Sequence, residues 1–327
     1  MKITVLGAGA WGTALASLLH QGKHAVTLWG HDAEHLEDLR RTGRNERYLP
    51  GIDLPRDWTL ESDLPRAVLD SECLVVAVPS KAFRKVTSHL SQFNGVAVSV
   101  TKGIEHDTGL TMCGLLCANS PLAKTAALSG PTLALEVARG IPAAIVAASD
   151  DAATAQLVHQ LFHRPNFRVY TSSDLLGVEM GGALKNVIAI ASGVCDGLGF
   201  GDNSKAALVT RAIVEIRKLG VACGAQAETF SGLSGLGDLT VTCFSRLSRN
   251  RAFGERLGHG ETLADTLAGS VSVAEGYPTA HSAWQLARKH QISTPIINEV
   301  HAMLYEDKNM KQAVRDLIGR DSKAEDG

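Results

Sequence analysis

Short apolar runs alternate with amphipathic helical patterns through the first half of the chain. Each run is bounded by turn residues and is short enough to predict a buried strand rather than a helix. Helical segments fall between most of the runs, which is typical of a largely parallel sheet covered by helices on both faces. The predicted strands are residues 2–6, 25–29, 73–78, 96–100, 125–129, 142–148 and 167–170.

The pattern changes near residue 174, where convincing strands disappear and longer helical segments begin. Two other stretches predict loops: residues 43–58 are polar and contain Pro and Gly, and residues 231–238 are rich in glycine. The predicted helices of this second half are residues 174–196, 203–224, 279–290 and 293–306.

The first strand runs directly into Gly7-Ala8-Gly9-Ala10-Trp11-Gly12, and a helical pattern follows at once. In such a turn Gly7 permits the tight bend, Gly9 lets the backbone approach a pyrophosphate, and Gly12 lets the helix pack on the strand. The helix directs its free N–H groups and positive end toward the diphosphate. A purely structural glycine turn is the alternative, but the position between strand and helix favours a dinucleotide site.

These patterns predict an α/β protein with two domains. Residues 1–175 form a Rossmann-type domain with a mostly parallel sheet, and residues 176–327 form an all-helical domain. A length of 327 residues is ample for two cores. We expect the active site between the two domains.

Composition excludes several classes of function. The chain is 45% hydrophobic and 20% charged, with a formal net charge of −2 and no strongly basic segment, so neither nucleic acid nor an anionic membrane is an expected partner. Residues 3–22 lack charged side chains, as a signal sequence would. The glycines and the strand–turn–helix pattern argue instead for mature structure, with no stable membrane insertion.

The cysteines do not predict a metal site. Cys113 and Cys117 are four residues apart and would share a helix face, but no second ligand pair accompanies them. We expect buried, reduced thiols in a cytoplasmic protein. The six cysteines are Cys73, Cys113, Cys117, Cys195, Cys223 and Cys243.

Lys185 is the leading candidate for acid–base chemistry. Lys185 and Asn186 are followed by an apolar stretch without charge up to Asp196. Burial in such a helix lowers the pKa of a lysine, which suits an acid–base catalyst near neutral pH. The alternative is a lysine at the solvent edge of a half-buried helix.

Two further segments follow predicted strands. Lys102 comes after the run VAVSV, at the carboxyl end of a strand, where open α/β sheets bind ligands. The segment Ser129-Gly130-Pro131-Thr132 also ends a strand, and Thr132 would either cap the next helix or present N–H groups to a ligand. An ordinary loop lysine and an ordinary helix cap are the alternatives.

A cationic cluster suggests a phosphate site. Arg246, Arg249 and Arg251 lie close together with Ser248 and Asn250 between them. Guanidinium, hydroxyl and amide donors together suit a phosphate on a small substrate, whereas a solvated basic turn is the alternative.

Two acidic residues and the end of the second strand leave choices open. Asp238 could orient a lysine or a substrate hydroxyl, or be a plain turn aspartate, and Glu275 has the same ambiguity. After the second strand come His31 and Asp32. An acidic residue there would accept a hydrogen bond from the ribose of NAD, whereas His31 would meet a 2′-phosphate, so NAD and NADP both remain open.

Taken together, these residues resemble the bacterial type of NAD(P)-dependent glycerol-3-phosphate dehydrogenase over nearly the whole chain. The matching segments are GAGAWGTALA at 7–16, VAVPSKAFR at 76–84, TKGIE at 101–105, LSGPTLALEVA at 128–138, GALKNVIAIASG at 182–193, SGLSGLGDL at 231–239, SRN at 248–250 and VAEGYPTA at 273–280.

The resemblance implies a role for each matching position. Lys185 would be the proton acceptor, and Lys102 would contact both substrate and cofactor. The remaining substrate-binding positions would be Gly130, Thr132, Asp238, Ser248, Arg249 and Asn250. The cofactor-binding positions would be Gly7, Gly9, Ala10, Trp11, Gly12, His31, Lys102, Ala134, Arg249, Val273 and Glu275. Relatives often carry Ser where this chain has Ala10, so any hydroxyl contact there is lost.

The implied reaction interconverts dihydroxyacetone phosphate and sn-glycerol 3-phosphate with NADP or NAD, NADPH being favoured, and needs no metal. It would supply glycerophospholipid synthesis in the cytoplasm, and the helical domain would allow a homodimer. Two alternatives remain: a related 3-hydroxyacid or ketopantoate reductase with the same domain plan, and a redox-sensing protein that binds the cofactor without turnover.

Overall fold

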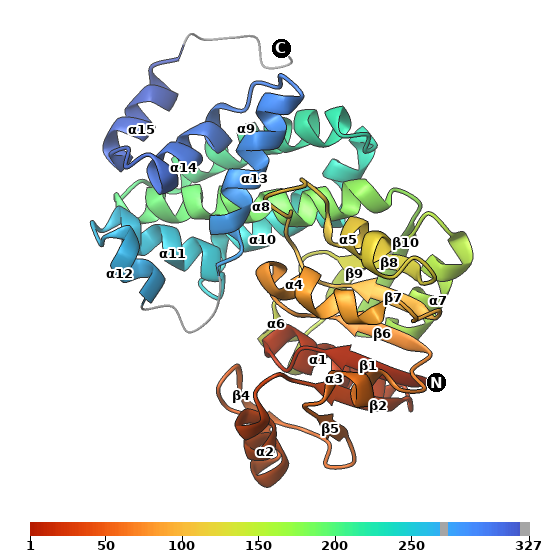
Figure 1. Ribbon diagram of the computed structural model, residues 1–327. Helices are drawn as coiled ribbons and strands as arrows, with labels where there is room; N and C mark the ends of the chain where they lie inside the picture. Colours follow the sequence, from red (N-terminus) through yellow and green to blue (C-terminus); the bar gives the residue numbers. More distant parts are fainter. Residues whose placement is uncertain (269–273, 321–327) are drawn as a thin grey trace.

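An eight-stranded sheet forms the N-terminal half of the computed structural model, which describes residues 1–268 and 274–320 (Figure 1). Its strand order is β10-β9-β8-β7-β6-β1-β2-β5, and all neighbours are parallel except β8 and β9. The mostly parallel sheet is therefore confirmed. The strands are β1 (Lys2–Leu6), β2 (Ala25–Trp29), β5 (Thr59–Glu61), β6 (Cys73–Val76), β7 (Val96–Ser99), β8 (Lys124–Ser129), β9 (Ala143–Ala148) and β10 (Phe167–Ser172).

Both faces of the sheet are covered, because successive side chains of each strand point to opposite sides. Val75 and Val98 belong to one buried cluster, whereas Leu74 and Ala97 belong to the cluster on the other face. Two-sided burial explains why β6 and β7 read as continuous apolar runs. The helices of this half are α1 (Ala10–Gln21), α2 (Ala33–Thr42), α3 (Leu64–Val68), α4 (Ser80–Thr87), α5 (Met112–Asn119), α6 (Ala134–Ala138) and α7 (Ala152–Phe162), with the short 3-10 turn η1 (Ser88–Leu90).

The prediction of a loop over residues 43–58 was wrong. This segment contains an antiparallel hairpin of β3 (Arg44–Asn45) and β4 (Leu49–Asp53), and the sheet-edge strand β5 follows it. Besides the buried Leu49, a buried amide anchors the hairpin: Asn45 is 0% exposed and donates to Ala8 O. Hydrophobic periodicity cannot reveal an anchor of that kind.

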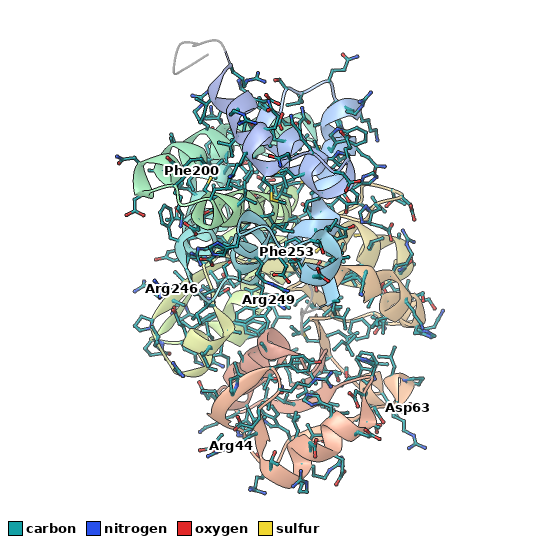
Figure 2. All side chains as sticks on the ribbon, turned by 90° about the vertical axis from the view of Figure 1, so that its left-hand side faces the viewer. Arg44, Asp63, Phe200, Arg246, Arg249 and Phe253 are labelled. Carbon is teal, nitrogen blue, oxygen red and sulfur yellow. The ribbon has the colours of Figure 1, made fainter. Side chains whose placement is uncertain are left out.

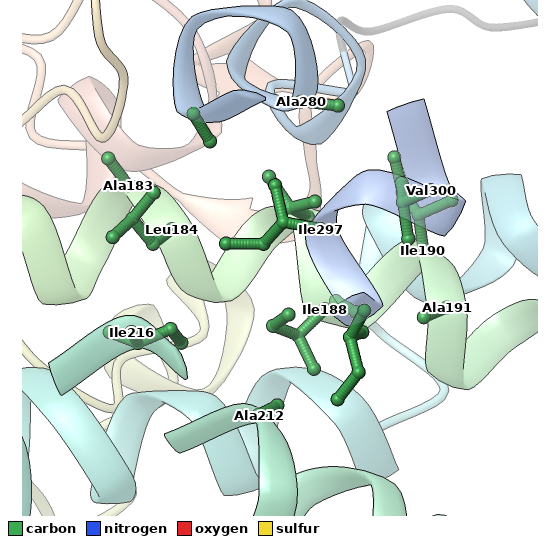
Figure 3. Close-up of a cluster of buried hydrophobic side chains, with 14 of the residues drawn as sticks. Ala183, Leu184, Ile188, Ile190, Ala191, Ala212, Ile216, Ala280, Ile297 and Val300 are labelled. Carbon is green, nitrogen blue, oxygen red and sulfur yellow. The ribbon is translucent and has the colours of Figure 1, made fainter. Parts of the chain in front are cut away.

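The second half is helical and is organised around α8 (Leu175–Gly197). Figure 3 shows side chains of α8, among them Leu184 and Ile188, packed against Ala212 and Ile216 of a neighbouring helix. Within the described ranges α8 is the one helix long and apolar enough to cross a membrane, and 94% of its apolar window is buried inside the protein. The other helices are α9 (Asp202–Ala222), α10 (Asp238–Phe244), α11 (Arg249–Gly258), α12 (Leu263–Ala268), α13 (Gly276–Lys289), α14 (Pro295–Tyr305) and α15 (Met310–Ile318).

Helices α8 and α11 approach each other closely enough for their backbones to touch. A Cβ added at Gly193 would lie 1.9 Å from Arg251 O, and one at Gly254 would lie 2.0 Å from Ile190 O. Glycine at these positions lets the two helices cross with no side chain between them. Their separation is therefore set by main-chain contact.

The glycine-rich segment 231–238 is not a loop, contrary to the prediction. A 3-10 turn, η2 (Ala227–Ser231), is followed after Gly232 by a π-helical turn, η3 (Leu233–Gly237), which continues directly into α10. Gly235 packs on the backbone of Phe230, where an added Cβ would lie 2.2 Å from Phe230 O. The glycines here serve close packing, which the composition alone does not distinguish from a flexible loop.

The cysteines are all free, but the prediction that they are buried holds only in part. Cys117 is exposed on α5, whereas Cys113, one turn earlier, is buried. Cys73, Cys113 and Cys243 are buried, and Cys195 and Cys223 are half-buried. No group of three or more metal-binding side chains occurs within residues 1–268 and 274–320.

The domain boundary at residues 175 and 176 stays a prediction, and the last strand ends at Ser172.

Candidate active site

The glycine turn between β1 and α1 forms a cradle at a break in the sheet order. Strand β1 lies between β2 and β6, so the strand order reverses at β1. In sheets of this kind such a reversal places a crevice at the carboxyl ends of the strands. Gly7 has φ +124°, and a Cβ there would lie 2.8 Å from Ala77 O; one at Gly12 would lie 1.9 Å from Gly7 O. At Gly9, by contrast, a Cβ would meet no atom within 4 Å.

This cradle fits a pyrophosphate. The first turn of α1 has no side-chain cap, so its N–H groups and positive end are open to an anion. Ala10 and Trp11 are half-buried in that turn, beside the open space at Gly9. The residues predicted for the diphosphate of a dinucleotide are thus assembled in a shape that accepts it.

Two lysines share one buried carboxylate where the sheet meets the helical half. Lys185 Nζ lies 2.6 Å from Asp238 Oδ1, and Lys102 Nζ lies 2.5 Å from Asp238 Oδ2. The side chains of Lys185 and Asp238 are 7% and 1% exposed, whereas Lys102 keeps 18% of its side chain open. The structure therefore brings together three predicted site residues from β7–α5, α8 and α10, and it excludes the solvent-edge alternative for Lys185.

Burial lowers the pKa of Lys185, the negative charge of Asp238 opposes this shift, and the positive charge of Lys102 adds to it; together they bring the pKa to about 8. An ammonium group with this pKa can release and regain its proton near neutral pH. Lys185 thus has the electrostatic setting that an acid–base catalyst needs.

Thr242 and Asn186, which were not among the predicted site residues, make hydrogen bonds to residues that were. Lys185 donates to Thr242 Oγ1, whose own hydroxyl donates to Asp238 O at 2.6 Å. Asn186 Oδ1 accepts from Asn250 Nδ2 at 2.9 Å. The signal for Thr242 was its spacing of four residues from Asp238, which places both on one face of a helix.

The strand end at Ser129–Thr132 lies against Lys102, which donates to Gly130 O at 3.0 Å. Thr132 Oγ1 also donates to Gly130 O, and α6 has Leu133 at its N-cap, so Thr132 is not a helix cap. The hydroxyl of Ser129 is buried without a hydrogen-bond partner among the described residues, and an added Cβ at Gly182 would lie 2.5 Å from it.

The arginine cluster divides into three different environments. Arg249 is exposed at the start of α11, between the helical half and the sheet half in Figure 2, whereas Arg246 lies at the edge of that view. Arg251 is buried and committed to Asp196, with Nε 2.6 Å from Oδ2. Ser248 caps α11 by accepting from the Arg251 N–H at 3.2 Å. Arg246 and Arg249 are both exposed, and neither has an acidic partner at ion-pair distance within the residues described; of the two, Arg249 lies at the junction of the two halves.

Arg249 and Glu275 lie close enough for the charge of each to influence the other. The surrounding protein lowers the pKa of the Arg249 guanidinium, and Glu275 opposes this shift. Burial raises the pKa of Glu275, which accepts from Ser80 N at 3.0 Å and also from the Ser80 hydroxyl. Glu275 thus joins the start of α13 to the start of α4, across the two halves of the chain. Ala134 begins α6, and the predicted cofactor residue Val273 lies outside the described residues.

The end of β2 carries an exposed His31 and an Asp32 that is already engaged. Asp32 caps α2 by accepting from His35 N at 3.0 Å, and its other oxygen lies 3.2 Å from Arg47 Nη1. The hydrogen bond from the His35 N–H holds the pKa of Asp32 below its usual value. Asp32 is thus a helix cap and an ion-pair partner.

A groove of about 900 Å³ borders the site. Leu133 of the sheet half and Leu236 and Phe244 of the helical half line it, so both halves contribute to its walls. Thr132 and Asp238 are the chain neighbours of lining residues Leu133 and Gly237. None of the predicted substrate residues is among the lining residues, so the position of the active site between the two halves stays a prediction.

Hydride transfer to a carbonyl needs a dinucleotide site and a proton donor near it, and the glycine turn and the buried Lys185 are candidates for these two parts. The class of protein defined in this way is a two-domain dehydrogenase that depends on a nicotinamide dinucleotide. Comparison with known proteins specifies it further. The sequence models of the N-terminus and the C-terminus of NAD-dependent glycerol-3-phosphate dehydrogenase match residues 2–155 and 174–315. The chain belongs to this family, which confirms the resemblance.

Relatives match the chain over its whole length. A glycerol-3-phosphate dehydrogenase [NAD(P)+] of Geobacter sulfurreducens is 48% identical over 99% of this chain and 98% of its own. That of Fusobacterium nucleatum is 46% identical over 99% and 98%. The crystal structure of glycerol-3-phosphate dehydrogenase from Coxiella burnetii superposes with a TM-score of 0.94 at 35% identity, covering 98% of this chain and 99% of that one.

Proposed function

We propose that the protein interconverts dihydroxyacetone phosphate and sn-glycerol 3-phosphate, with Lys185 as the proton donor and acceptor. The observation that carries the proposal is the buried Lys185–Asp238–Lys102 cluster, in which the pKa of Lys185 is lowered to about 8. The names of the Geobacter and Fusobacterium relatives support glycerol 3-phosphate as one member of this pair and NAD(P)+ as the oxidant.

The glycine turn from Gly7 to Gly12 would hold the dinucleotide, and the reduced nicotinamide supplies the hydride when it is bound. We propose NADPH as the favoured cofactor. Asp32, the acidic residue that would select a free ribose hydroxyl, is already engaged by a backbone N–H and by Arg47. His31 stands exposed beside it and can approach a 2′-phosphate.

Lys185 moves the proton. As an ammonium it donates to the ketone oxygen that becomes the secondary alcohol, and as an amine it accepts the alcohol proton in the reverse direction. With a pKa of about 8, about one-tenth of the molecules are neutral at pH 7, so both forms are accessible. Asp238 and Thr242 fix the amino group, and Lys102 stabilises negative charge on the reacting oxygen.

Arg249 would hold the phosphate of the substrate, since its guanidinium is an exposed cation at the junction of the two halves. The first turn of α11 adds the N–H groups and positive end of a helix. Ser248 and Asn250 support this turn: the first caps it, and the second is tied to Asn186 at 2.9 Å. Gly130 and Thr132 would line the substrate site on the side of Lys102, which donates to Gly130 O.

We further propose that the enzyme works in the cytoplasm and that its sn-glycerol 3-phosphate serves glycerophospholipid synthesis. The family membership supports this setting.

A spectrophotometric assay tests the proposal. The purified protein should oxidise NADPH, and then NADH, only when dihydroxyacetone phosphate is added. Lys185→Met should reduce kcat by about 10²–10⁴ because the general acid is lost. Lys205→Met is the matched control, since Lys205 is also buried beside an acid, Asp196 at 3.0 Å, but outside the proposed catalytic cluster. Full turnover in Lys185→Met contradicts the assigned role. Turnover of a non-phosphorylated keto acid, with none of dihydroxyacetone phosphate, contradicts the substrate.

A further inference from the structure

The hairpin of β3 and β4 is pinned to the dinucleotide turn by one buried side chain. Asn45 is 0% exposed, and its Nδ2 donates to Ala8 O at 3.0 Å and to Thr13 Oγ1 at 2.8 Å. Ala8 lies within the glycine turn, and Thr13 lies in the first turns of α1. The hairpin therefore has a fixed position relative to the cofactor cradle.

This anchor places Arg47, two residues further along, near the carboxyl end of β2. Its Nη1 lies 3.2 Å from Asp32 Oδ2, and its guanidinium carbon lies 5.1 Å from the centre of the Tyr48 ring. The Arg47 side chain is 53% exposed and that of Asp32 is 38% exposed, so both are open to a ligand. In sheets of this kind the 2′ position of the adenosine ribose lies beside the residues that follow the second strand.

Two opposite charges therefore meet at the 2′ position. A free carboxylate would accept a hydrogen bond from a 2′-hydroxyl and repel a 2′-phosphate, whereas an arginine would bind the phosphate. Asp32 already accepts from His35 N at 3.0 Å through one oxygen, and Arg47 offsets the charge of the other. The position of the Arg47 guanidinium over the Tyr48 ring already restricts the rotamers of Arg47. Less side-chain entropy is therefore lost when Arg47 binds a ligand.

We propose that Arg47 is the specificity-determining residue for the 2′-phosphate of NADPH and that Asp32 competes for the same guanidinium. This inference rests on the dinucleotide site of the proposed function. The hairpin would thus distinguish NADPH from NADH, while the glycine turn would hold the diphosphate that the two cofactors share.

Binding measurements test the inference without turnover. NADPH and NADH are titrated by fluorescence, and 2′,5′-ADP and 5′-ADP are used as competitors. Arg47→Ala should weaken NADPH and 2′,5′-ADP by about 10-fold to 150-fold, as expected for the loss of a charge-assisted contact, with NADH changed by less than about twofold. Asp32→Asn keeps a residue that caps helices well and releases Arg47, so it should tighten NADPH and leave NADH unchanged.

Arg44→Ala is the matched control. Arg44 belongs to the same hairpin, at the lower end of the molecule in Figure 2, and pairs with Asp53 at 2.7 Å. It should change neither cofactor. Equal binding of NADPH by Arg47→Ala and the unaltered protein would overturn the inference and leave the proposed function intact. Equal losses of NADPH and NADH would also overturn it, because they indicate a role in holding the hairpin. Failure of the unaltered protein to bind either dinucleotide would instead contradict the proposed function.

Discussion

Replacing Asp238 by Asn keeps the shape of the side chain and removes the one negative charge that Lys102 and Lys185 share. In the native cluster the two carboxylate oxygens lie 2.5 and 2.6 Å from the two ammonium groups. In Asp238→Asn two buried ammonium groups face each other without a counter-charge. The ammonium form of Lys185 then becomes harder to maintain, so its pKa falls further below about 8.

The size of the shift follows from the contact that is lost. A hydrogen bond to a charged group contributes about 1.5–3 kcal/mol, and one pKa unit corresponds to about 1.4 kcal/mol. The pKa of Lys185 should therefore fall by about one to two units. Oxidation of sn-glycerol 3-phosphate, which uses the amine, would then persist to lower pH. Reduction of dihydroxyacetone phosphate uses the ammonium and is lost as the pH rises through the pKa of Lys185. In the variant this loss would occur at a lower pH.

Initial rates of both reactions across pH measure this shift as the inflection in kcat/KM. Breaking a buried pair also costs about 3–5 kcal/mol of stability, so thermal unfolding must show that Asp238→Asn is folded at the assay temperature. Thr242→Val is the control, because it removes a neutral partner of Lys185 and should leave the inflection near its native value. An unchanged or raised inflection in folded Asp238→Asn would refute the reasoning.

Three further predictions concern other parts of the molecule. Arg249→Ala should raise KM for dihydroxyacetone phosphate by about 10-fold to 150-fold, whereas exposed Arg246→Ala should not; steady-state kinetics compares them, and equal effects would contradict the phosphate clamp. Gly9→Ala should fold normally, because the added methyl group meets only open space. It should lose cofactor affinity, because the methyl group would occupy the space proposed for the pyrophosphate. Gly12→Ala should instead lose about 1–3 kcal/mol or more of stability in denaturant titrations, because its Cβ would lie 1.9 Å from a backbone oxygen; the reverse ranking would contradict the geometry. Burial raises the pKa of Glu215 from 4.5 to about 7, so the folded chain keeps this proton longer than the unfolded chain and the free energy of unfolding falls as pH rises between those values. Glu215→Gln should lack this fall of up to about 3 kcal/mol, and an unaltered pH slope would count against it.

The sequence predicted the central strands well because their burial is two-sided. Strands β1 and β2 occupy the predicted residues 2–6 and 25–29, while the run predicted at 73–78 ends as a strand at Val76. Each is a continuous apolar run, which is the pattern that burial on both faces imposes. The helix α8 was equally clear, since nearly its whole length is buried and apolar.

Polar anchors and backbone packing could not be predicted in the same way. Asn45 is buried by virtue of partners 32 and 37 residues away, which no local pattern contains. Ser80 meets Glu275 across 195 residues of chain. The grouping of Lys102, Lys185 and Asp238 likewise depends on tertiary contact, so each was a candidate with an ordinary alternative, and no local pattern indicated that the three side chains meet.

The backbone contact of α8 with α11 has a consequence for how this enzyme tolerates change. Lys185 lies on α8 and Arg249 begins α11, so the spacing between the proposed proton donor and the proposed phosphate clamp depends on the main-chain contacts at Gly193 and Gly254. Core side chains elsewhere in the helical half can then be exchanged without altering the length of substrate that fits. Libraries that vary those side chains should yield variants with altered stability and unaltered selectivity for a three-carbon phosphate.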